Sequence, residues 1–367
     1  MSEESAFKNF INAGVVKRLG DAFHKAYPKF DTKAFNKLSD KLAPLELKQR
    51  VLLITAEFRR QLPEPFLKAA PIVKKVLNSG NLSGFQLWPV SEYISQFGTE
   101  DLETSMDLMY IMTQSFTSEF AIRPFLLKDP VKTMKILEGW IEDENVHIRR
   151  WISEGTRPNL PWGGKIPSFI KKPATLHLLE ALKYDEELYV RKSVSNHLND
   201  ISKDHPDLLI KTLKSWNKEA PEAHKAKIKW ITKQALRTMI KKGHPGALGL
   251  MGVKHGAEVS VSKIKLNQKE YELGDVLSFE FTLESESKKS QDVIVDYSVG
   301  FIKSNGTLVH KVFKLKALTL KAGEKVVIKK NHSLKRITTM TFYSGEHEVQ
   351  IQVNGKIMKK APWNFHP

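Results

Sequence analysis

Three carboxylates stand in segments that are otherwise basic or apolar, and their setting is the first sign of chemistry in this sequence. Glu119 lies where a helix rich in Met and aromatic residues is expected to end at an Arg-Pro pair, Glu154 is flanked by Arg150 and Arg157, and Asp200 closes a later helix. A carboxylate beside a basic groove would repel phosphates, so we expect these acids to face something cationic. The structural alternative is that Glu154 pairs with Arg150 or Arg157 and that Asp200 caps a turn.

A tryptophan lies in a loop of chain-breaking residues that begins at Arg157. The segment Pro158-Asn159-Leu160-Pro161-Trp162-Gly163-Gly164 places Trp162 between prolines and glycines, so we expect its indole to be exposed. Such a ring stacks on a base or sugar face, or else fills a core.

Metal, nucleotide and nucleophile motifs are missing from the sequence. The 12 His residues show no His-Glu-x-x-His spacing, and the absence of Cys excludes thiolate zinc sites, iron–sulfur clusters and Cys nucleophiles. The run Gly163-Gly164-Lys165 lacks the earlier glycine of a phosphate loop and is followed by Ile166 where Ser or Thr would bind magnesium. No Gly-x-Ser-x-Gly elbow occurs. We therefore expect neither a metal nor a cofactor.

Five cations recur every four residues between Ala223 and Lys242, which the periodicity predicts to be one helix. They are Lys225, Lys229, Lys233, Arg237 and Lys241. Each step of four residues drifts by only about 40° around a helix, so the cations form a slowly winding stripe. Like charges at this spacing repel, and a bound polyanion would relieve the repulsion and release counterions. We expect Lys229, Lys233 and Arg237 to contact DNA phosphates; the alternative is a solvated lysine face.

The composition supports a polyanionic partner. The 367 residues include 58 Lys and Arg against 41 Asp and Glu, a formal net charge of +17. Nucleic acid is the leading candidate partner, and an acidic membrane surface and generic basicity are the alternatives. The acidic start at Met1-Ser2-Glu3-Glu4 and the lack of a long apolar run predict a cytoplasmic protein without a signal peptide or membrane span.

The chain changes character near residue 256. Helical periodicity broken by Pro or Gly dominates before this point, and short alternating stretches such as residues 277–283 and 349–353 follow it. Turn signals at 304–306, 322–324 and 354–355 separate about seven such strands, typical of an antiparallel immunoglobulin-like β-sandwich without the Cys pair of antibody domains. We predict a mainly α fold with a helical domain at 1–255 and an all-β domain at 256–367, which carry net charges of +11 and +6.

A weak repeat runs through the helical part. The clusters Ile148-Arg149-Arg150, Val190-Arg191-Lys192 and Ile228-Lys229-Trp230 are separated by 42 and 38 residues. This period matches the two-helix units of HEAT-type solenoids, which present a concave face to an extended ligand. An irregular helical bundle is the alternative.

Two strings of this helical part carry a family resemblance. Ser118-Glu119-Phe120-Ala121-Ile122-Arg123-Pro124-Phe125 and Ser153-Glu154-Gly155-Thr156-Arg157-Pro158-Asn159-Leu160-Pro161-Trp162 resemble the bacterial AlkC branch of the HEAT-like-repeat alkylpurine DNA glycosylases, related to AlkD. The β-sandwich is similar to the immunoglobulin-like domain that accompanies this branch. Asn159 departs from the pattern, because a basic residue often stands there, and this leaves one phosphate contact open.

The resemblance implies removal of cationic N3-alkylated purines, notably 3-methyladenine, from duplex DNA as the first step of base excision repair. It also implies that the lesion need not be flipped into a pocket, unlike the usual strategy. The alkylated base is already a cationic leaving group, so carboxylates need only stabilise the oxocarbenium-like sugar and orient water.

By matching positions, the resemblance makes Glu119 and Glu154 the leading catalytic candidates and Asp200 the third. It places Trp162 near the sugar of the lesion, while Arg150 and Arg157 would hold flanking phosphates. It implies a monomer in the bacterial cytoplasm that binds double-stranded DNA containing alkylated bases. Two other classes stay open: a non-catalytic HEAT-repeat DNA-binding or scaffold protein, and a protein-interaction adaptor.

Overall fold

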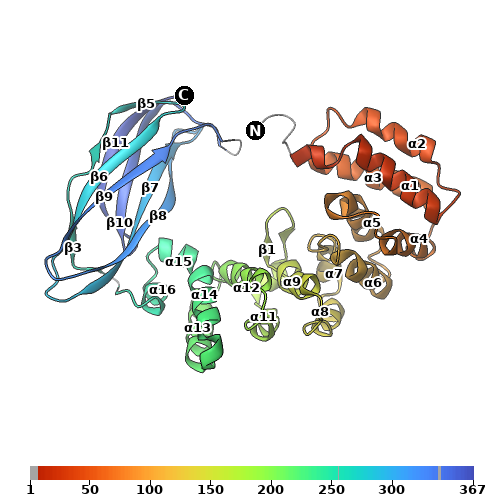
Figure 1. Ribbon diagram of the computed structural model, residues 1–367, viewed down its shortest axis with the longest axis horizontal. Coiled ribbons are helices and arrows are strands. Elements are labelled where there is room, and N and C mark those ends of the chain that lie inside the picture. Colours follow the sequence, from red (N-terminus) through yellow and green to blue (C-terminus); the bar gives the residue numbers. More distant parts are fainter. Residues whose placement is uncertain (1–6, 255, 338–339) are drawn as a thin grey trace. The chain divides into compact units, whose positions relative to one another are not determined.

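The computed structural model describes residues 7–254, 256–337 and 340–367 (Figure 1). The chain forms two compact units. The helical unit holds the described residues up to Asp204 together with Pro221–Ile231, and the sandwich unit holds His205–Ala220 and Thr232–Pro367.

Helices occupy the first two thirds of the chain. The α-helices are α1 (Ala13–Ala26), α2 (Thr32–Asn36), α3 (Leu47–Gln61), α4 (Phe66–Asn78), α5 (Trp88–Phe97), α6 (Leu102–Thr113), α7 (Arg123–Lys128), α8 (Pro130–Glu138), α9 (Val146–Gly155), α10 (Pro167–Lys171), α11 (Leu176–Leu182), α12 (Leu188–Ile201), α13 (Pro206–Glu219), α14 (Lys225–Ala235), α15 (Arg237–Lys241) and α16 (Pro245–Leu250). Short 3₁₀ helices are η2 (Phe7–Phe10), η3 (Lys37–Lys41), η4 (Gly84–Leu87) and η5 (Glu222–His224).

The helical unit is built from helices that pack on the helix two or three places further along the chain. Helix α3 packs on α5, α4 on α6, and α9 on α12. Each helix buries one apolar face, as α9 does with Ile148, Trp151 and Ile152. In Figure 1, α9 and α12 form one layer of this unit and α8 and α11 the other. This layered packing confirms the predicted HEAT-like repeat.

The two repeat copies at Arg149 and Arg191 make equivalent hydrogen bonds. Arg149 Nη1 donates to the carbonyls of Asp143 (2.7 Å) and Glu144 (3.0 Å), and Arg191 Nη1 donates to those of Asp185 (2.6 Å) and Glu186 (2.7 Å). The side chains of Asp143 and Asp185 each accept a backbone N–H two residues further on, at 2.8 Å. The 42-residue offset therefore reflects one conserved local geometry, an arginine at the start of a helix that fixes the preceding turn.

Strands form the rest of the chain. A two-stranded hairpin in the helical unit consists of β1 (Asn159–Leu160) and β2 (Gly164–Lys165), and the sandwich consists of β3 (Val259–Val261), β4 (Lys265–Leu266), β5 (Glu270–Glu272), β6 (Val276–Ser285), β7 (Gln291–Ile302), β8 (Leu308–Leu320), β9 (Lys325–Ser333), β10 (Gly345–Val353) and β11 (Lys356–His366).

The sandwich has two sheets around one apolar core. One sheet has the order β5-β11-β10-β7-β8, and in the other β6 pairs with β3, β4 and β9. Their inner faces bury aromatic residues such as Tyr271, Phe281 and Trp363. The turn between β10 and β11 is the predicted Asn354-Gly355 pair, and both residues have positive φ, as a two-residue hairpin of this type requires. The predicted immunoglobulin-like sandwich is confirmed.

The last helices are attached to the sandwich. Gln352 Nε2 donates to the carbonyl of Lys241 at 3.1 Å, and a Cβ added to Gly355 would lie 2.0 Å from the Cα of Gly243. The change from helix to strand falls between Leu250 and Val259, around the predicted boundary at 255/256, although α13, α15 and α16 belong to the sandwich unit. His255 lies outside the described residues, and the division at 255/256 stays a prediction.

Candidate active site

The three candidate acids come from three separate segments of the helical unit. Glu154 lies in the last turn of α9 and Asp200 near the end of α12. Glu119 lies in the loop between α6 and α7, because α6 ends at Thr113 and does not continue to the Arg-Pro pair as predicted. All three side chains are buried. Because α9 packs on both α6 and α12, this stacking brings together acids that are far apart in the sequence.

Arginines alternate with the acids in one chain of ion pairs. Arg150 Nη1 binds Glu119, and Arg150 Nη2 lies 3.7 Å from Glu154 Oε2. Arg157 Nη1 donates to Glu154 Oε1 at 2.6 Å, and Arg157 Nε donates to Asp200 Oδ2 at 2.8 Å. Both predicted pairings of Glu154 are therefore present at once. We call this set, with Thr117 and Lys203 at its ends, the acid–arginine chain.

The two ends of the acid–arginine chain are also bonded. Thr117 Oγ1 donates to Glu119 Oε2 at 3.0 Å and accepts from Arg150 Nη1 at 3.0 Å. Lys203 Nζ donates to Asp200 Oδ1 at 2.9 Å, so this carboxylate holds two cations. The carboxylates thus have fixed positions before any ligand arrives.

Burial and charge act in opposite directions on Arg157. Burial alone would lower its pKa, but the hydrogen bond to Asp200 and the charge of Glu154 outweigh burial and raise the pKa of the guanidinium. Arg157 is only 7% exposed, so it holds two carboxylates where we expected it to meet a phosphate. Arg150 is partly exposed and lies 5.2 Å from the centre of the Tyr189 ring.

Glu119 and Glu154 line a hollow of about 350 Å³ whose other walls are largely aromatic. Its remaining lining residues are Phe85, Trp88, Phe116, Thr117, Phe120, Leu160, Pro161 and Trp162. The rings support one another, since Trp88 stacks on Phe120 with centroids 5.9 Å apart. Asp200 does not line this hollow, but Arg157 links its carboxylate to that of Glu154. A hollow with carboxylates in an aromatic wall suits a cationic, planar ligand.

Trp162 lies at the tip of the β1–β2 hairpin and is 76% exposed, which confirms the expected exposed indole. Its φ of 64° is one of two positive values among the described non-glycine residues. A left-handed backbone costs a large side chain about 1–2 kcal/mol, so the hairpin holds this indole in place at some expense of stability.

The cation stripe runs over two helices, so the prediction of one helix from Ala223 to Lys242 is wrong. Helix α14 ends at Ala235, and α15 begins at Arg237 after Leu236. Lys229 and Lys233 are exposed, whereas Arg237 is half-buried and donates to the carbonyl of Gln234 at 2.7 Å.

Part of the stripe faces the sandwich. Lys233 and Arg237 line a hollow of about 450 Å³ in the sandwich unit together with Asp292, Asp296 and Lys314. Burial raises the pKa of Asp296, although Gln352 and nearby lysines act against this shift. The two acids offset part of the local positive charge at this end of the stripe.

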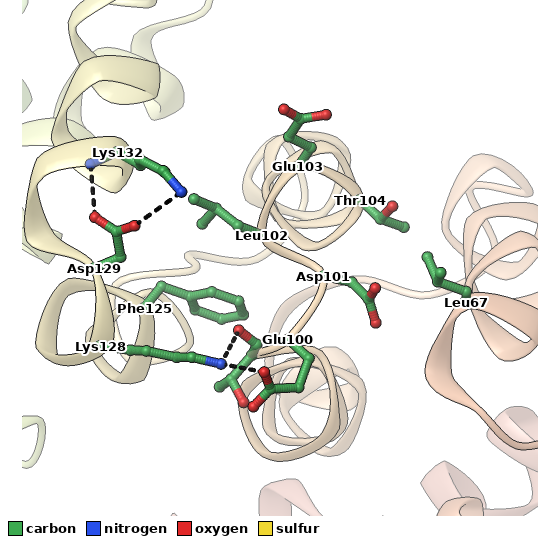
Figure 2. Close-up of a pocket in the computed structure, with 11 residues that line it drawn as sticks. Leu67, Glu100, Asp101, Leu102, Glu103, Thr104, Phe125, Lys128, Asp129 and Lys132 are labelled. Carbon is green, nitrogen blue, oxygen red and sulfur yellow. Dashed lines mark hydrogen bonds and ion pairs between the residues drawn. The ribbon is translucent and has the colours of Figure 1, made fainter.

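A larger hollow of about 600 Å³ lies elsewhere in the helical unit, beside the start of α6 and the helices α7 and α8 (Figure 2). Two ion pairs lie among its lining residues: Lys128 lies 2.6 Å from Glu100, and Lys132 lies 3.5 Å from Asp129. None of the candidate residues lines it. We therefore take the smaller hollow, which Glu119 and Glu154 line, as the candidate active site.

Arg123 is a site residue that the sequence reasoning did not select. Its buried guanidinium donates to the carbonyls of Gly155 (3.2 Å), Arg157 (2.9 Å) and Gly164 (2.9 Å), which joins α9 to the hairpin. Burial and the charge of Arg157 lower the pKa of Arg123 to about 10. The available signal was the arginine directly before Pro124, in the string that also holds Glu119.

Within the described ranges, no group of three or more His, Cys, Asp or Glu side chains is arranged to hold a metal ion. Among the same residues, no helix is both long and apolar enough to cross a membrane.

Fold and site together define a class: a helical-repeat protein with an immunoglobulin-like domain and a carboxylate-lined aromatic hollow. The family described as "Uncharacterised protein YhaZ, C-terminal Ig-like domain" matches residues 260–367. The uncharacterized protein YhaZ of Bacillus subtilis is 36% identical over 355 residues, which cover 95% of this chain and 96% of YhaZ.

The structure of the Pseudomonas fluorescens alkylpurine DNA glycosylase AlkC, bound to DNA containing an abasic site analog, is also similar. It is 35% identical with a TM-score of 0.89, over 99% of this chain and all of that one. The chain belongs to the AlkC family, which includes YhaZ, and the predicted resemblance is confirmed.

Proposed function

We propose that this protein is a DNA glycosylase that hydrolyses the N-glycosidic bond of cationic N3-alkylated bases, notably 3-methyladenine, in duplex DNA. The observation that carries the proposal is the placement of Glu119 and Glu154 in the aromatic hollow, each held by arginine. Membership of the AlkC family supports the reaction class, because the Pseudomonas fluorescens member is an alkylpurine DNA glycosylase. The product would enter base excision repair.

The chemistry needs little more than fixed negative charge. As the bond between the base and C1′ breaks, its electron pair leaves with the alkylated base and neutralises the charge on that base. Positive charge then develops on the sugar, where a preorganised carboxylate stabilises it. Water adds its oxygen to C1′ and releases one proton, which Glu154 or solvent accepts. The base needs no proton from the protein, so two ionised acids suffice.

Each neighbouring group has a role in this scheme. We propose that Glu119 and Glu154 stabilise the oxocarbenium-like sugar and position water, and that Asp200 is the third acid and acts through Arg157. Trp162 would stack near the sugar of the lesion. The described residues that line the hollow include no lysine, so no amine is placed there to attack the sugar, which supports a monofunctional hydrolase.

The remaining assignments concern DNA. We propose that Arg150, Lys229, Lys233 and Arg237 contact phosphates of the duplex, and that the protein works as a monomer on DNA in the cytoplasm without a cofactor. For Arg157 a phosphate contact would require release of a carboxylate, so we now favour a supporting role. We propose 1–255 as the glycosylase domain and 256–367 as its immunoglobulin-like companion.

The test is base release from duplexes that carry single defined methyl lesions. Glu154→Gln and Glu119→Gln keep the shape and remove the charge, so each is expected to slow single-turnover release by about 100-fold or more. Glu100→Gln is the matched control, because Glu100 is an ion-paired glutamate in the larger hollow. Full release by folded Glu154→Gln would refute charge stabilisation by Glu154. Tight DNA binding without any release by the native chain would favour the non-catalytic scaffold.

A further inference from the structure

Arg123 is buried in a way that arginines seldom are. Its side chain is 3% exposed, and the three hydrogen bonds given above all go to backbone carbonyls. Two of these acceptors follow Glu154: Gly155 is the last residue of α9, and Arg157 lies two residues beyond this helix. The third, Gly164, lies on β2 of the hairpin that carries Trp162.

The hairpin is packed closely against Arg123. A Cβ added to Gly163 would lie 2.9 Å from Arg123 Cδ and 2.7 Å from Leu160 Cδ2, so only glycine fits between them without displacement. Trp162 is the residue immediately before this contact. The guanidinium and the aliphatic part of the Arg123 side chain therefore hold the hairpin in place, while the indole of Trp162 stays exposed.

A lysine could not replace this arrangement. The planar guanidinium presents several N–H donors in a rigid fork, so one side chain serves carbonyls from two segments, whereas an ammonium is a single point on a flexible stem. Burial of this cation is costly, since the protein partners of its fork are neutral carbonyls. This cost is consistent with a role in which the hydrogen bonds of Arg123 fix two segments relative to each other.

We infer that Arg123 is a positioning residue that locks the Trp162 hairpin to the end of α9, which fixes the spacing between the indole and Glu154. Its catalytic consequence rests on the proposed glycosylase function, but the positional lock does not. Arg123 stands four residues after Glu119, so one short segment supplies an acid of the hollow and the anchor of the hairpin that carries Trp162.

The first measurement follows Trp162 directly. The protein is labelled with 5-fluorotryptophan, which gives one ¹⁹F resonance for each of its seven tryptophans, and Trp162→Phe identifies the signal of Trp162. Arg123→Lys is expected to shift and sharpen this signal as the hairpin gains freedom. Gly163→Ala disturbs the same contact from the hairpin side, and it serves if Arg123→Lys fails to fold.

Arg50 offers a matched control. It is 5% exposed and also donates to three backbone carbonyls, those of Lys8, Ile11 and Leu45, at 2.8–2.9 Å. Arg50→Lys loses the same kind of bonds far from the hairpin in sequence, so it is expected to lower stability without moving the Trp162 resonance. An unchanged Trp162 signal in Arg123→Lys, or an equal change in Arg50→Lys, would overturn the inference.

The second measurement is a double-mutant cycle on base release. Arg123→Lys is expected to slow single-turnover release about tenfold or more, since misplacement by about 1 Å costs up to 100-fold. In a Trp162→Ala background the same change is expected to cost less than about twofold, because the group it positions is gone. Losses that multiply would contradict action through Trp162. If the native chain releases no base, the proposed function fails, and the ¹⁹F measurement still decides the positional role.

Discussion

Replacement of Lys229, Lys233 and Arg237 together by glutamine is expected to flatten the salt dependence of DNA binding. Each phosphate contact contributes about 0.9 to the slope of log K against log salt concentration. Lys229 and Lys233 are exposed, so each contributes in full, whereas Arg237 is half-buried and already bonded to the carbonyl of Gln234. We therefore expect the slope to change by about 2 rather than the ~2.7 that three free contacts would give.

The assay is fluorescence anisotropy with a duplex that carries a stable abasic-site analogue, titrated between about 50 and 200 mM salt. Over this fourfold range, a slope change of 2 makes the triple variant lose roughly 16-fold less affinity than the native chain. The control variant replaces Lys211, Lys214 and Lys218 of α13 by glutamine. These lysines are exposed, and their replacement removes the same net charge. An unchanged slope, or an equal change in the control, would refute a specific phosphate track along α14 and α15.

Three further predictions concern single residues. Trp162→Gly relieves a positive φ of 64°, so it is expected to raise the free energy of unfolding by about 1 kcal/mol in urea titrations. The same change is expected to weaken binding to abasic-site DNA about tenfold. A variant that loses both stability and DNA affinity would count against the stacking role. Gly355→Ala is expected to destabilise the chain far more than Gly306→Ala, because both have a φ of 77° but only Gly355 meets another backbone; equal melting temperatures would disprove the docking contact. Burial lowers the pKa of His197 to about 4, so the unfolded chain binds the extra proton between pH 6.5 and 4. Acid should therefore remove about 3 kcal/mol of stability over this range, and His197→Gln should reduce that pH dependence.

Local patterns in the sequence predicted the elements well. Alternation marks β6 and β10, and the Asn354-Gly355 pair marks the turn between β10 and β11, where both residues have positive φ. The prolines and glycines around Trp162 predicted an exposed loop residue, and the structure has one. Each of these features depends on neighbours within a few residues, so the sequence contains the information directly.

The pairing of residues that lie one repeat apart could be predicted only in part. Arg157 and Asp200 are 43 residues apart, close to the 42-residue repeat offset, so the repeat itself hinted that α9 and α12 would bring them together. The spacing could not show that the Arg157 side chain would be buried and would bind two acids instead of a phosphate. That choice depends on burial, which follows from packing of the whole stack.

The break at Leu236 and the role of Arg123 were missed for a related reason. A four-residue spacing of cations continues through Leu236, yet the chain leaves the α-helix there for one residue, and no Pro or Gly marks the place. Arg123 binds carbonyls, and every residue has a carbonyl. The residue types in the sequence therefore do not indicate which backbone carbonyls an arginine side chain binds.

The acid–arginine chain explains how a protein of net charge +17 keeps carboxylates at its candidate active site. Three acids and three cations, counting Lys203, alternate along it, so their formal charges cancel. Unpaired carboxylates buried at this depth would cost several kcal/mol each, and the guanidiniums offset that cost. Since Glu119 and Glu154 still line the hollow, negative charge meets a ligand there while basic residues elsewhere attract the duplex. Loss of Arg157, which is buried and has no proposed phosphate contact, is therefore expected to harm the site by releasing Glu154 and Asp200 from their positions.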